Sequence, residues 1–109
     1  MAEDFSERRN FVRFARILPV KIVNIETKEE ASAQTHDLSA KGIGFITDKE
    51  MVKNSNLEIW VYIPDNMDPL HAVGRVAWSK KVGIAAFRVG VDLEQVDFVA
   101  VSRVIRLTN

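Results

Sequence analysis

Two short motifs in the N-terminal half carry the residue types best suited to binding an anionic ligand that contains bases. Arg9-x-x-x-Arg13 has a further arginine, Arg8, before it, and an Asp-x-Ser-x-x-Gly pattern begins 24 residues after Arg13, at Asp37. A chain with seven Asp, six Ser and five Gly is expected to contain that second pattern about 0.02 times by chance, whereas one Arg pair at this spacing is expected about 0.6 times. The Asp-Ser-Gly motif is therefore the informative one.

The residue types of both motifs fit a ligand with phosphates and purines. A planar guanidinium pairs bidentately with phosphate oxygens or with guanine O6 and N7, and its face stacks on a base. Asp37 would accept hydrogen bonds from guanine N–H groups, Ser39 would offer a hydroxyl, and Gly42 would let the backbone approach closely. A plainer interpretation also exists, because a Ser/Asp turn closed by a glycine at positive φ is a common hairpin device.

Residues for catalysis are scarce. The chain has no Cys, which excludes thiol catalysis, disulfides and Cys-ligated zinc, and it has only two histidines, His36 and His71. His36-Asp37-x-Ser39 contains the residue types of a catalytic triad, but neighbours on a strand point to opposite faces, so we expect no hydrogen bond between His36 and Asp37. We predict no enzymatic activity, no cofactor and no metal site.

The elements that must position these residues are short β-rich runs separated by turn residues. Such a pattern predicts an all-β fold, and a closed or partly open antiparallel barrel would leave few strand edges unpaired. After the last run, Val96, Ala100, Val104 and Leu107 form the apolar stripe of a C-terminal helix. The runs are Phe14–Ile25, Ala31–His36, Gly42–Thr47, Leu57–Ile63, His71–Ser79 and Ile84–Leu93.

Several residues inside these runs predict local irregularities. Pro19 lacks an N–H group and predicts a strand edge or a bulge, and Gly74 and Gly90 predict bulges or barrel corners. Lys80–Gly83 is typical of a hairpin connection. The first ten residues are polar and mixed in charge, with only Phe5 apolar in their interior, and predict a flexible N-terminal arm, residues 1–12, ahead of a barrel domain that spans residues 13–109.

Composition narrows the class of partner. The 109 residues are 47% hydrophobic, with 15 basic and 15 acidic side chains, so the formal net charge is zero. Non-specific binding to nucleic acid usually needs a basic excess, which argues against that function. The longest apolar runs, of about six residues, are too short to cross a bilayer, and no signal peptide is recognisable. We therefore expect a cytoplasmic protein without a nucleic-acid or membrane partner.

The two motifs, in this order and ahead of a small barrel, resemble those of the PilZ domain, the receptor family for the bacterial second messenger cyclic di-GMP. Gly74–Trp78 and Arg88–Leu93 also look like the family's last two barrel strands. The resemblance implies a six-stranded antiparallel PilZ-type (split) barrel with a C-terminal α-helix and a flexible N-terminal arm. It also implies that cyclic di-GMP is the ligand and that it contacts Arg9, Arg13, Asp37, Ser39 and Gly42, to which we add Arg8 as a further predicted contact.

The resemblance further implies a receptor whose arm folds over the ligand and changes how the domain engages a protein partner or a second copy of itself. The outputs expected for such a protein are motility, exopolysaccharide production, biofilm formation or virulence. Because Arg8 adds a guanidinium beyond the pair, we predict two stacked ligand molecules per domain. Two alternatives stay open: a small barrel that binds single-stranded nucleic acid, and a PilZ-like interaction module that does not use the ligand.

Overall fold

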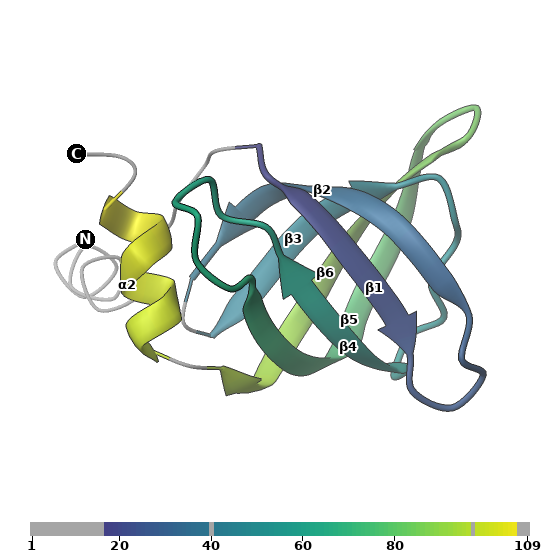
Figure 1. The fold of residues 1–109 in the computed structure, drawn as a ribbon. Coiled ribbons are helices and arrows are strands. Elements are labelled where there is room, and N and C mark those ends of the chain that lie inside the picture. The colour runs from purple at the N-terminus through teal and green to yellow at the C-terminus, as the bar shows by residue number, and fades with distance from the viewer. Residues whose placement is uncertain (1–16, 40, 97, 107–109) are drawn as a thin grey trace, which may run out of the picture.

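The computed structural model describes residues 17–39, 41–96 and 98–106, which form a closed antiparallel barrel with one helix (Figure 1). The predicted six-stranded all-β barrel with a C-terminal helix is confirmed. Arg8, Arg9 and Arg13 lie outside the described residues, as does the predicted arm, residues 1–12. The strands follow one another around the barrel as β1-β2-β3-β6-β5-β4. Their bounds are β1 Pro19–Asn24, β2 Glu30–Leu38, β3 Gly42–Thr47, β4 Asn56–Val61, β5 Leu70–Gly83 and β6 Ala86–Val96, and the helix is α2, Phe98–Arg106.

Apolar side chains from one face of each strand fill the barrel interior. In β4, Leu57, Ile59 and Val61 are fully buried and face Phe45 from β3, which is also fully buried. Alternate residues of a strand point to opposite faces, so one face of each strand supplies this core and the other meets solvent. Burial of these apolar side chains is the main force that closes the barrel.

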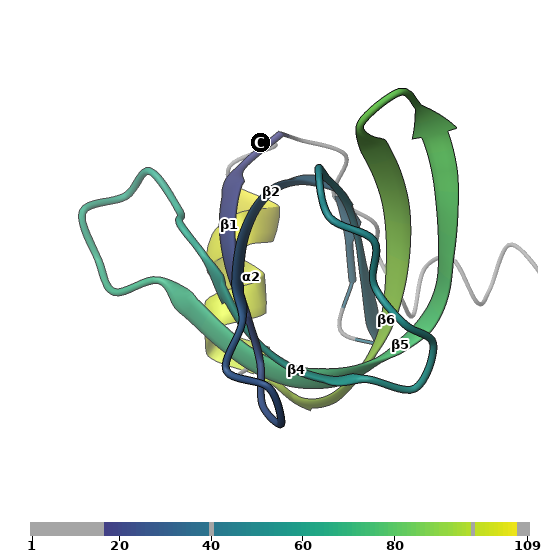
Figure 2. The same ribbon diagram turned by 90° about the vertical axis from the view of Figure 1, so that its right-hand side faces the viewer.

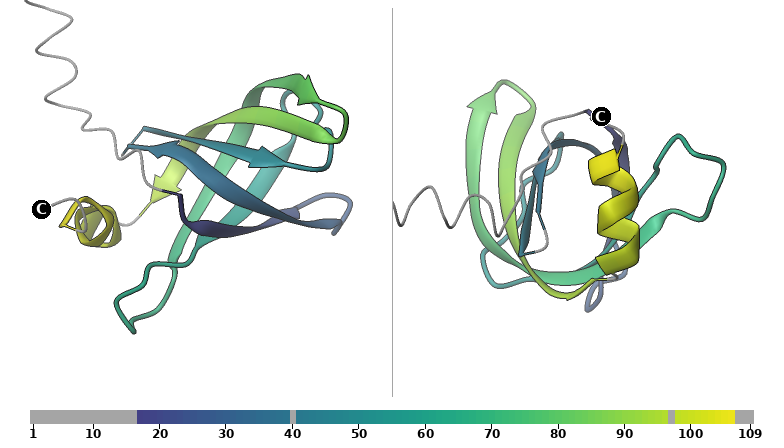
Figure 3. Two further views of the ribbon diagram at one scale, coloured as in Figure 1. Left: turned by 90° about the horizontal axis from the view of Figure 1, so that it is seen from above. Right: turned by 90° about the vertical axis from the view of Figure 1, so that its left-hand side faces the viewer.

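The helix α2 lies at one end of the barrel (Figure 3). Val104 of α2 is fully buried and belongs to the barrel core. The Arg103 guanidinium donates two hydrogen bonds of 2.8 Å to the Asp65 carboxylate and a third to the Asp68 carbonyl, in the loop between β4 and β5. A planar bidentate pair of this kind fixes orientation as well as distance, so it ties the helix to that loop. Within the described residues, no helix is long and apolar enough to span a membrane.

Several local predictions need correction. Pro19 lies at neither an edge nor a bulge: it is the first residue of β1, paired with Gln34, where a missing N–H is tolerated. The predicted connection Lys80–Gly83 belongs to β5, and the turn is Ile84–Ala85. Val96 ends β6 rather than starting the helix, because it pairs with Ala72. Leu107 lies outside the described residues.

The strands β5 and β6 extend beyond their neighbours and project as a hairpin at the end of the barrel opposite α2 (Figures 1 and 2). The neighbour β4 pairs with β5 only as far as Arg75, and β3 pairs with β6 only as far as Phe87. The turn between β1 and β2 and the loop between β3 and β4 lie at this same end. As predicted, Gly74 and Gly90 lie at shifts in the β5–β6 register.

Candidate functional site

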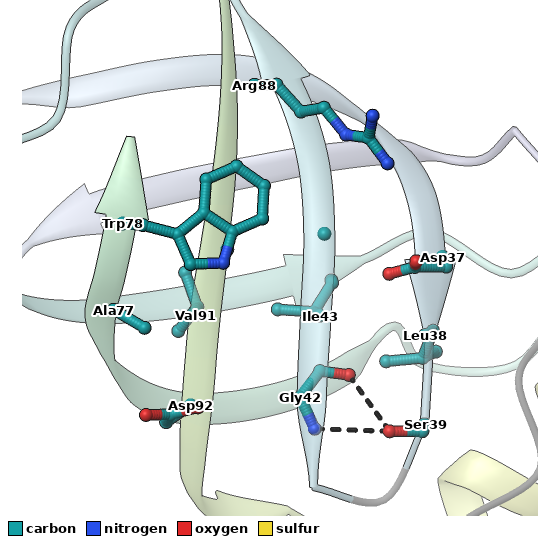
Figure 4. A pocket seen from close by; sticks show the side chains of 12 residues that line it. Asp37, Leu38, Ser39, Gly42, Ile43, Ala77, Trp78, Arg88, Val91 and Asp92 are labelled. Atoms are coloured by element: carbon teal, nitrogen blue, oxygen red, sulfur yellow. Dashed lines mark hydrogen bonds between the residues drawn. The ribbon is translucent and has the colours of Figure 1, made fainter. Parts of the chain in front are cut away.

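A row of four residues crosses the outer face of β2, β3, β6 and β5. Asp37 pairs with Gly44, Gly44 pairs with Gly90, and Gly90 pairs with Trp78. The two central positions carry no side chain, so the surface sinks between a carboxylate at one end of the row and an indole at the other. The result is a hollow of about 260 Å³, which Figure 4 shows from close by.

Both glycines are required by the close approach of the flanking side chains. A Cβ added at Gly44 would lie 2.7 Å from Oδ1 of Asp37, and one added at Gly90 would lie 2.3 Å from the Trp78 ring. Real Cβ atoms do not come this close to other heavy atoms, so any side chain here would push the carboxylate or the indole away. The glycines therefore set where both functional groups lie.

Asp37 reaches this outer face through a β-bulge. Ala31, Ala33 and Thr35 of β2 point into the barrel, and unbroken alternation would send Asp37 inward after them. The register between β2 and β3 shifts between Thr35 and Asp37, so His36 is an extra residue and the alternation changes phase. Asp37 consequently faces outward, with 27% of its side chain exposed.

Trp78 reaches the hollow in the same way. Val76 of β5 is buried and pairs with Val91, whereas Trp78 pairs with Gly90, so Ala77 is the extra residue of a second bulge. The indole is directed outward and is 46% exposed. The direction of the side chain at each end of the row thus depends on a bulge in the strand that carries it.

The bulge in β2 places His36 and Asp37 on the same side of the strand, so the expected opposite orientation is wrong, but the distance between Nδ1 and Oδ2 is too long for a hydrogen bond. Nδ1 of His36 lies 3.7 Å from Oδ2 of Asp37, and a guanidinium N–H of Arg88 donates to the same Nδ1 at 3.3 Å. Arg88 comes from β6 and also lines the hollow (Figure 4). The carboxylate of Asp37 and the guanidinium of Arg88 therefore both line the hollow, and the imidazole of His36 contacts each of them.

Ser39 and Gly42 build the turn that connects β2 to β3. The Ser39 N–H donates to the Gly42 carbonyl at 2.9 Å, and the Ser39 hydroxyl oxygen accepts from the N–H groups of Lys41 and Gly42 at 3.3 Å (Figure 4). The plainer interpretation of the motif, a serine-stabilised turn, is thus confirmed for Ser39. No described glycine has positive φ, so that detail of the interpretation is wrong. A Cβ at Gly42 would lie 3.1 Å from the Val91 carbonyl oxygen, which is tighter than ordinary contact and favours glycine there.

Of the six predicted site residues, Asp37, Ser39 and Gly42 all line the hollow, and the three arginines lie outside the described residues. Trp78, Arg88, Asp92, Gly44 and Gly90 also line the hollow and are not among the predicted site residues. The pairing register of the strands brings these residues close to Asp37, and no local sequence pattern reveals that register. Among the described residues there is no cluster of three potential metal ligands. The carboxylate of Asp92 is part of the lining of the hollow, which therefore offers hydrogen-bond acceptors, an aromatic face and a cation, a set that suits ligand binding.

The sequence matches the family model of the PilZ domain over residues 7–109. The chain belongs to the PilZ family. This family consists of ligand-binding receptor domains for cyclic di-GMP, and membership confirms the resemblance drawn from the two motifs. No curated protein matches the sequence.

Solved structures show the same fold at low sequence identity. The PilZ domain of YcgR from Escherichia coli, determined with c-di-GMP, is 14% identical, with a TM-score of 0.65 over 92% of this chain and 88% of that one. The PilZ domain of CeSA from a cellulose-synthesizing bacterium is 18% identical, with a TM-score of 0.58 over 87% and 92% of the two chains. The Bacillus subtilis inhibitor of motility MotI/DgrA is 16% identical, with a TM-score of 0.71 over 93% of this chain. Our chain spans about half of that protein, 51%.

Proposed function

We propose that this PilZ domain binds cyclic di-GMP in the hollow between Asp37 and Trp78 and passes the signal to a protein partner. The observation that supports this most strongly is the row in which two paired glycines separate a carboxylate from an indole. A guanine presents N–H donors that suit Asp37 and a flat π-face that suits Trp78. A ligand with both features matches both ends of the row.

The cationic side chains complete the proposed site. Arg88 lines the hollow and would approach a phosphate or the O6 and N7 atoms of a guanine. Arg9 and Arg13, the arginine pair of the family motif, would close over the ligand from the N-terminal side. Arg8 would stack on a second ligand molecule, which gives the predicted ratio of two per domain. Ser39 and Gly42 would act mainly by holding the turn that carries Asp37.

The output of the proposed receptor is a change in how the domain engages another protein. Ligand-dependent ordering of the residues around Arg9 and Arg13 would create a surface that the free domain lacks. Motility is the output we favour, because one neighbour in fold is an inhibitor of motility. Exopolysaccharide production, biofilm formation and virulence are further candidate outputs. The cytoplasmic location expected from the sequence stays a prediction.

Calorimetric titration with cyclic di-GMP tests the proposal. We expect micromolar or tighter binding by the parent, and affinities about 10- to 100-fold weaker for Arg9→Ala, Arg13→Ala and Asp37→Ala, since each loses a charge-assisted hydrogen bond. Asp48→Ala, an exposed carboxylate outside the hollow, is the matched control and should bind like the parent.

A folded parent that gives no binding heat with cyclic di-GMP, and no NMR shift at Gly42 or Gly44, would refute the proposal. That result would favour the alternative of an interaction module that does not use the ligand. Salt-dependent binding of single-stranded oligonucleotides by the same sample would instead favour the nucleic-acid alternative.

A further inference from the structure

The tip of the β5–β6 hairpin exposes apolar side chains that no part of the described fold covers. Ile84 is 98% exposed and Val82 is 50% exposed. Lys80 and Lys81, both exposed, lie next to them on β5, and neither forms an ion pair among the described residues. Lysines on a strand edge that lacks a partner discourage edge-to-edge pairing, but they give no reason for an isoleucine at the tip. An apolar tip on a cationic stem indicates a contact surface.

A hollow of opposite charge lies at the same end of the barrel. It has a volume of about 330 Å³ and lies between the β1–β2 turn and the β3–β4 loop. The half-buried Met51 and the exposed Val52 supply apolar surface alongside the buried Ile22 and Ala31, and four carboxylates surround them. Those carboxylates belong to Glu26, Glu29, Glu30 and Glu50, and Lys49 is the only cation in the lining.

Most of this negative charge is not neutralised within the described part of the chain. Glu30 lies 3.7 Å from the Lys21 ammonium, whereas Glu26, Glu29 and Glu50 form no ion pair there. The hollow therefore combines an apolar surface with an acidic rim. The hairpin tip has the complementary arrangement, an apolar end with basic flanks. Interfaces commonly match charge in this way to select partner and register.

We propose that the hairpin tip of one copy of the chain inserts into the acidic hollow of a second copy, and that the contact is reciprocal. Figure 2 looks onto this end of the barrel, with the hairpin at the upper right and the β1–β2 turn at the bottom. A twofold axis perpendicular to the barrel axis would place the corresponding ends of two copies face to face. The tip and the hollow lie on opposite sides of this end of the barrel. Each tip then meets the partner's hollow, and both contacts form at once.

The proposed interface does not rest on the cyclic di-GMP proposal. The residues at the tip and in the acidic hollow do not include Asp37, Gly44, Gly90 or Trp78. Ligand binding could fail with the dimer intact, or the reverse, so the two proposals are tested separately. If both hold, the dimer would present two ligand sites on one particle.

Sedimentation equilibrium over a wide concentration range, without ligand, is the first test. We expect a reversible monomer–dimer equilibrium, with dimerisation at least tenfold weaker in Ile84→Asp. Val99→Asp is the matched control, because Val99 is an exposed valine (67%) on α2 at the other end of the barrel. It should dimerise like the parent. Circular dichroism and thermal unfolding show that each variant is folded.

Charge reversal supplies the decisive test. We expect two double variants to be mainly monomeric: Lys80→Glu/Lys81→Glu, which reverses the tip, and Glu26→Lys/Glu29→Lys, which reverses the hollow. In a dimer of either variant, both tip–hollow contacts would join like charges. In a mixture of the two variants, one contact pairs the reversed tip with the reversed hollow and the other pairs the two native surfaces. We therefore expect the mixture to form a heterodimer about as tight as the parent dimer.

Three results would overturn the proposal. The first is a parent that is monomeric at every concentration. The second is a dimer that neither charge reversal weakens, or a mixture of the two charge-reversed variants that does not form a heterodimer. The third is a monomeric parent that binds phosphatidylglycerol vesicles and loses that binding in Ile84→Asp, which would assign the tip to an anionic membrane.

Discussion

Adding a single methyl group at Gly44 separates the role of the hollow from the stability of the fold. In Gly44→Ala the new Cβ would lie 2.7 Å from Oδ1 of Asp37, and ordinary contact needs about 3.4 Å, so the carboxylate must move by at least about 0.7 Å. Only the end of a partly exposed side chain has to shift. Alanine in place of a strand glycine gains about 0.5–1 kcal/mol, and an off-rotamer aspartate costs about as much. We expect the free energy of unfolding to change by less than about 1 kcal/mol.

The effect of Gly44→Ala on ligand binding should be much larger. Displacing the Asp37 carboxylate would remove a charge-assisted hydrogen bond worth about 1.5–3 kcal/mol, which corresponds to about 10- to 100-fold weaker binding of cyclic di-GMP. Calorimetric titration and urea unfolding measure the two quantities on one sample. Gly83→Ala is the matched control, because its Cβ would meet Ala86 at an ordinary 3.4 Å. An affinity within twofold of the parent would refute the reasoning, as would a loss of stability as large as the loss of binding.

Three further predictions concern the barrel, the indole and the helix. Gly74→Ala should lower the free energy of unfolding by about 2–3 kcal/mol in urea, because its Cβ would lie 2.6 Å from the Asp92 carbonyl oxygen and backbone would have to move. Trp78→Ala should weaken cyclic di-GMP binding about 5- to 100-fold in calorimetry, while Trp78→Phe keeps most of the affinity, because stacking needs an aromatic face. The hydrogen bonds from Arg103 hold the pKa of Asp65 below its usual value, so this pair stabilises the fold above that usual value and the contribution is lost as pH falls through the lowered pKa. Thermal unfolding below about pH 4 should therefore lose less stability in Asp65→Asn than in the parent, and equal pH dependence would contradict this.

Most of the fold could be predicted from the period-two pattern of the strands. Burial on one face of a strand repeats every second residue, so it can be recognised without knowing which distant residues pair with the strand. The Leu57–Ile63 run alternates as predicted, with Leu57, Ile59, Val61 and Ile63 buried. The ends of the elements were less predictable. Val96 was assigned to the helix because its spacing fits the apolar stripe, yet pairing with Ala72 keeps it in β6. Whether a residue at a boundary continues a strand depends on a partner about twenty residues away, which local pattern does not contain.

Only the site residues that belong to a recognisable sequence motif could be predicted. Asp37, Ser39 and Gly42 were found because their spacing is rare, and all three line the hollow. Trp78 and Arg88 were not assigned to it, because each reaches the hollow through pairing between strands that are distant in sequence. His36 was expected to point away from Asp37, and the bulge that brings them together follows from register rather than from residue type.

The two bulges explain how one small barrel can hold both a complete core and a polar site on the same strands. If β2 paired regularly with β3 and His36 took an ordinary place in the alternation, Asp37 would point into the core and Leu38, which is almost fully buried, would point outward. If β5 paired regularly with β6 and Ala77 took an ordinary place in the alternation, the Trp78 indole would compete for the interior space that Val76 and its neighbours fill. Each bulge changes the phase of alternation once, at the position where a strand passes from core to site. The proposed binding function and the packing of the barrel therefore depend on the same two bulges.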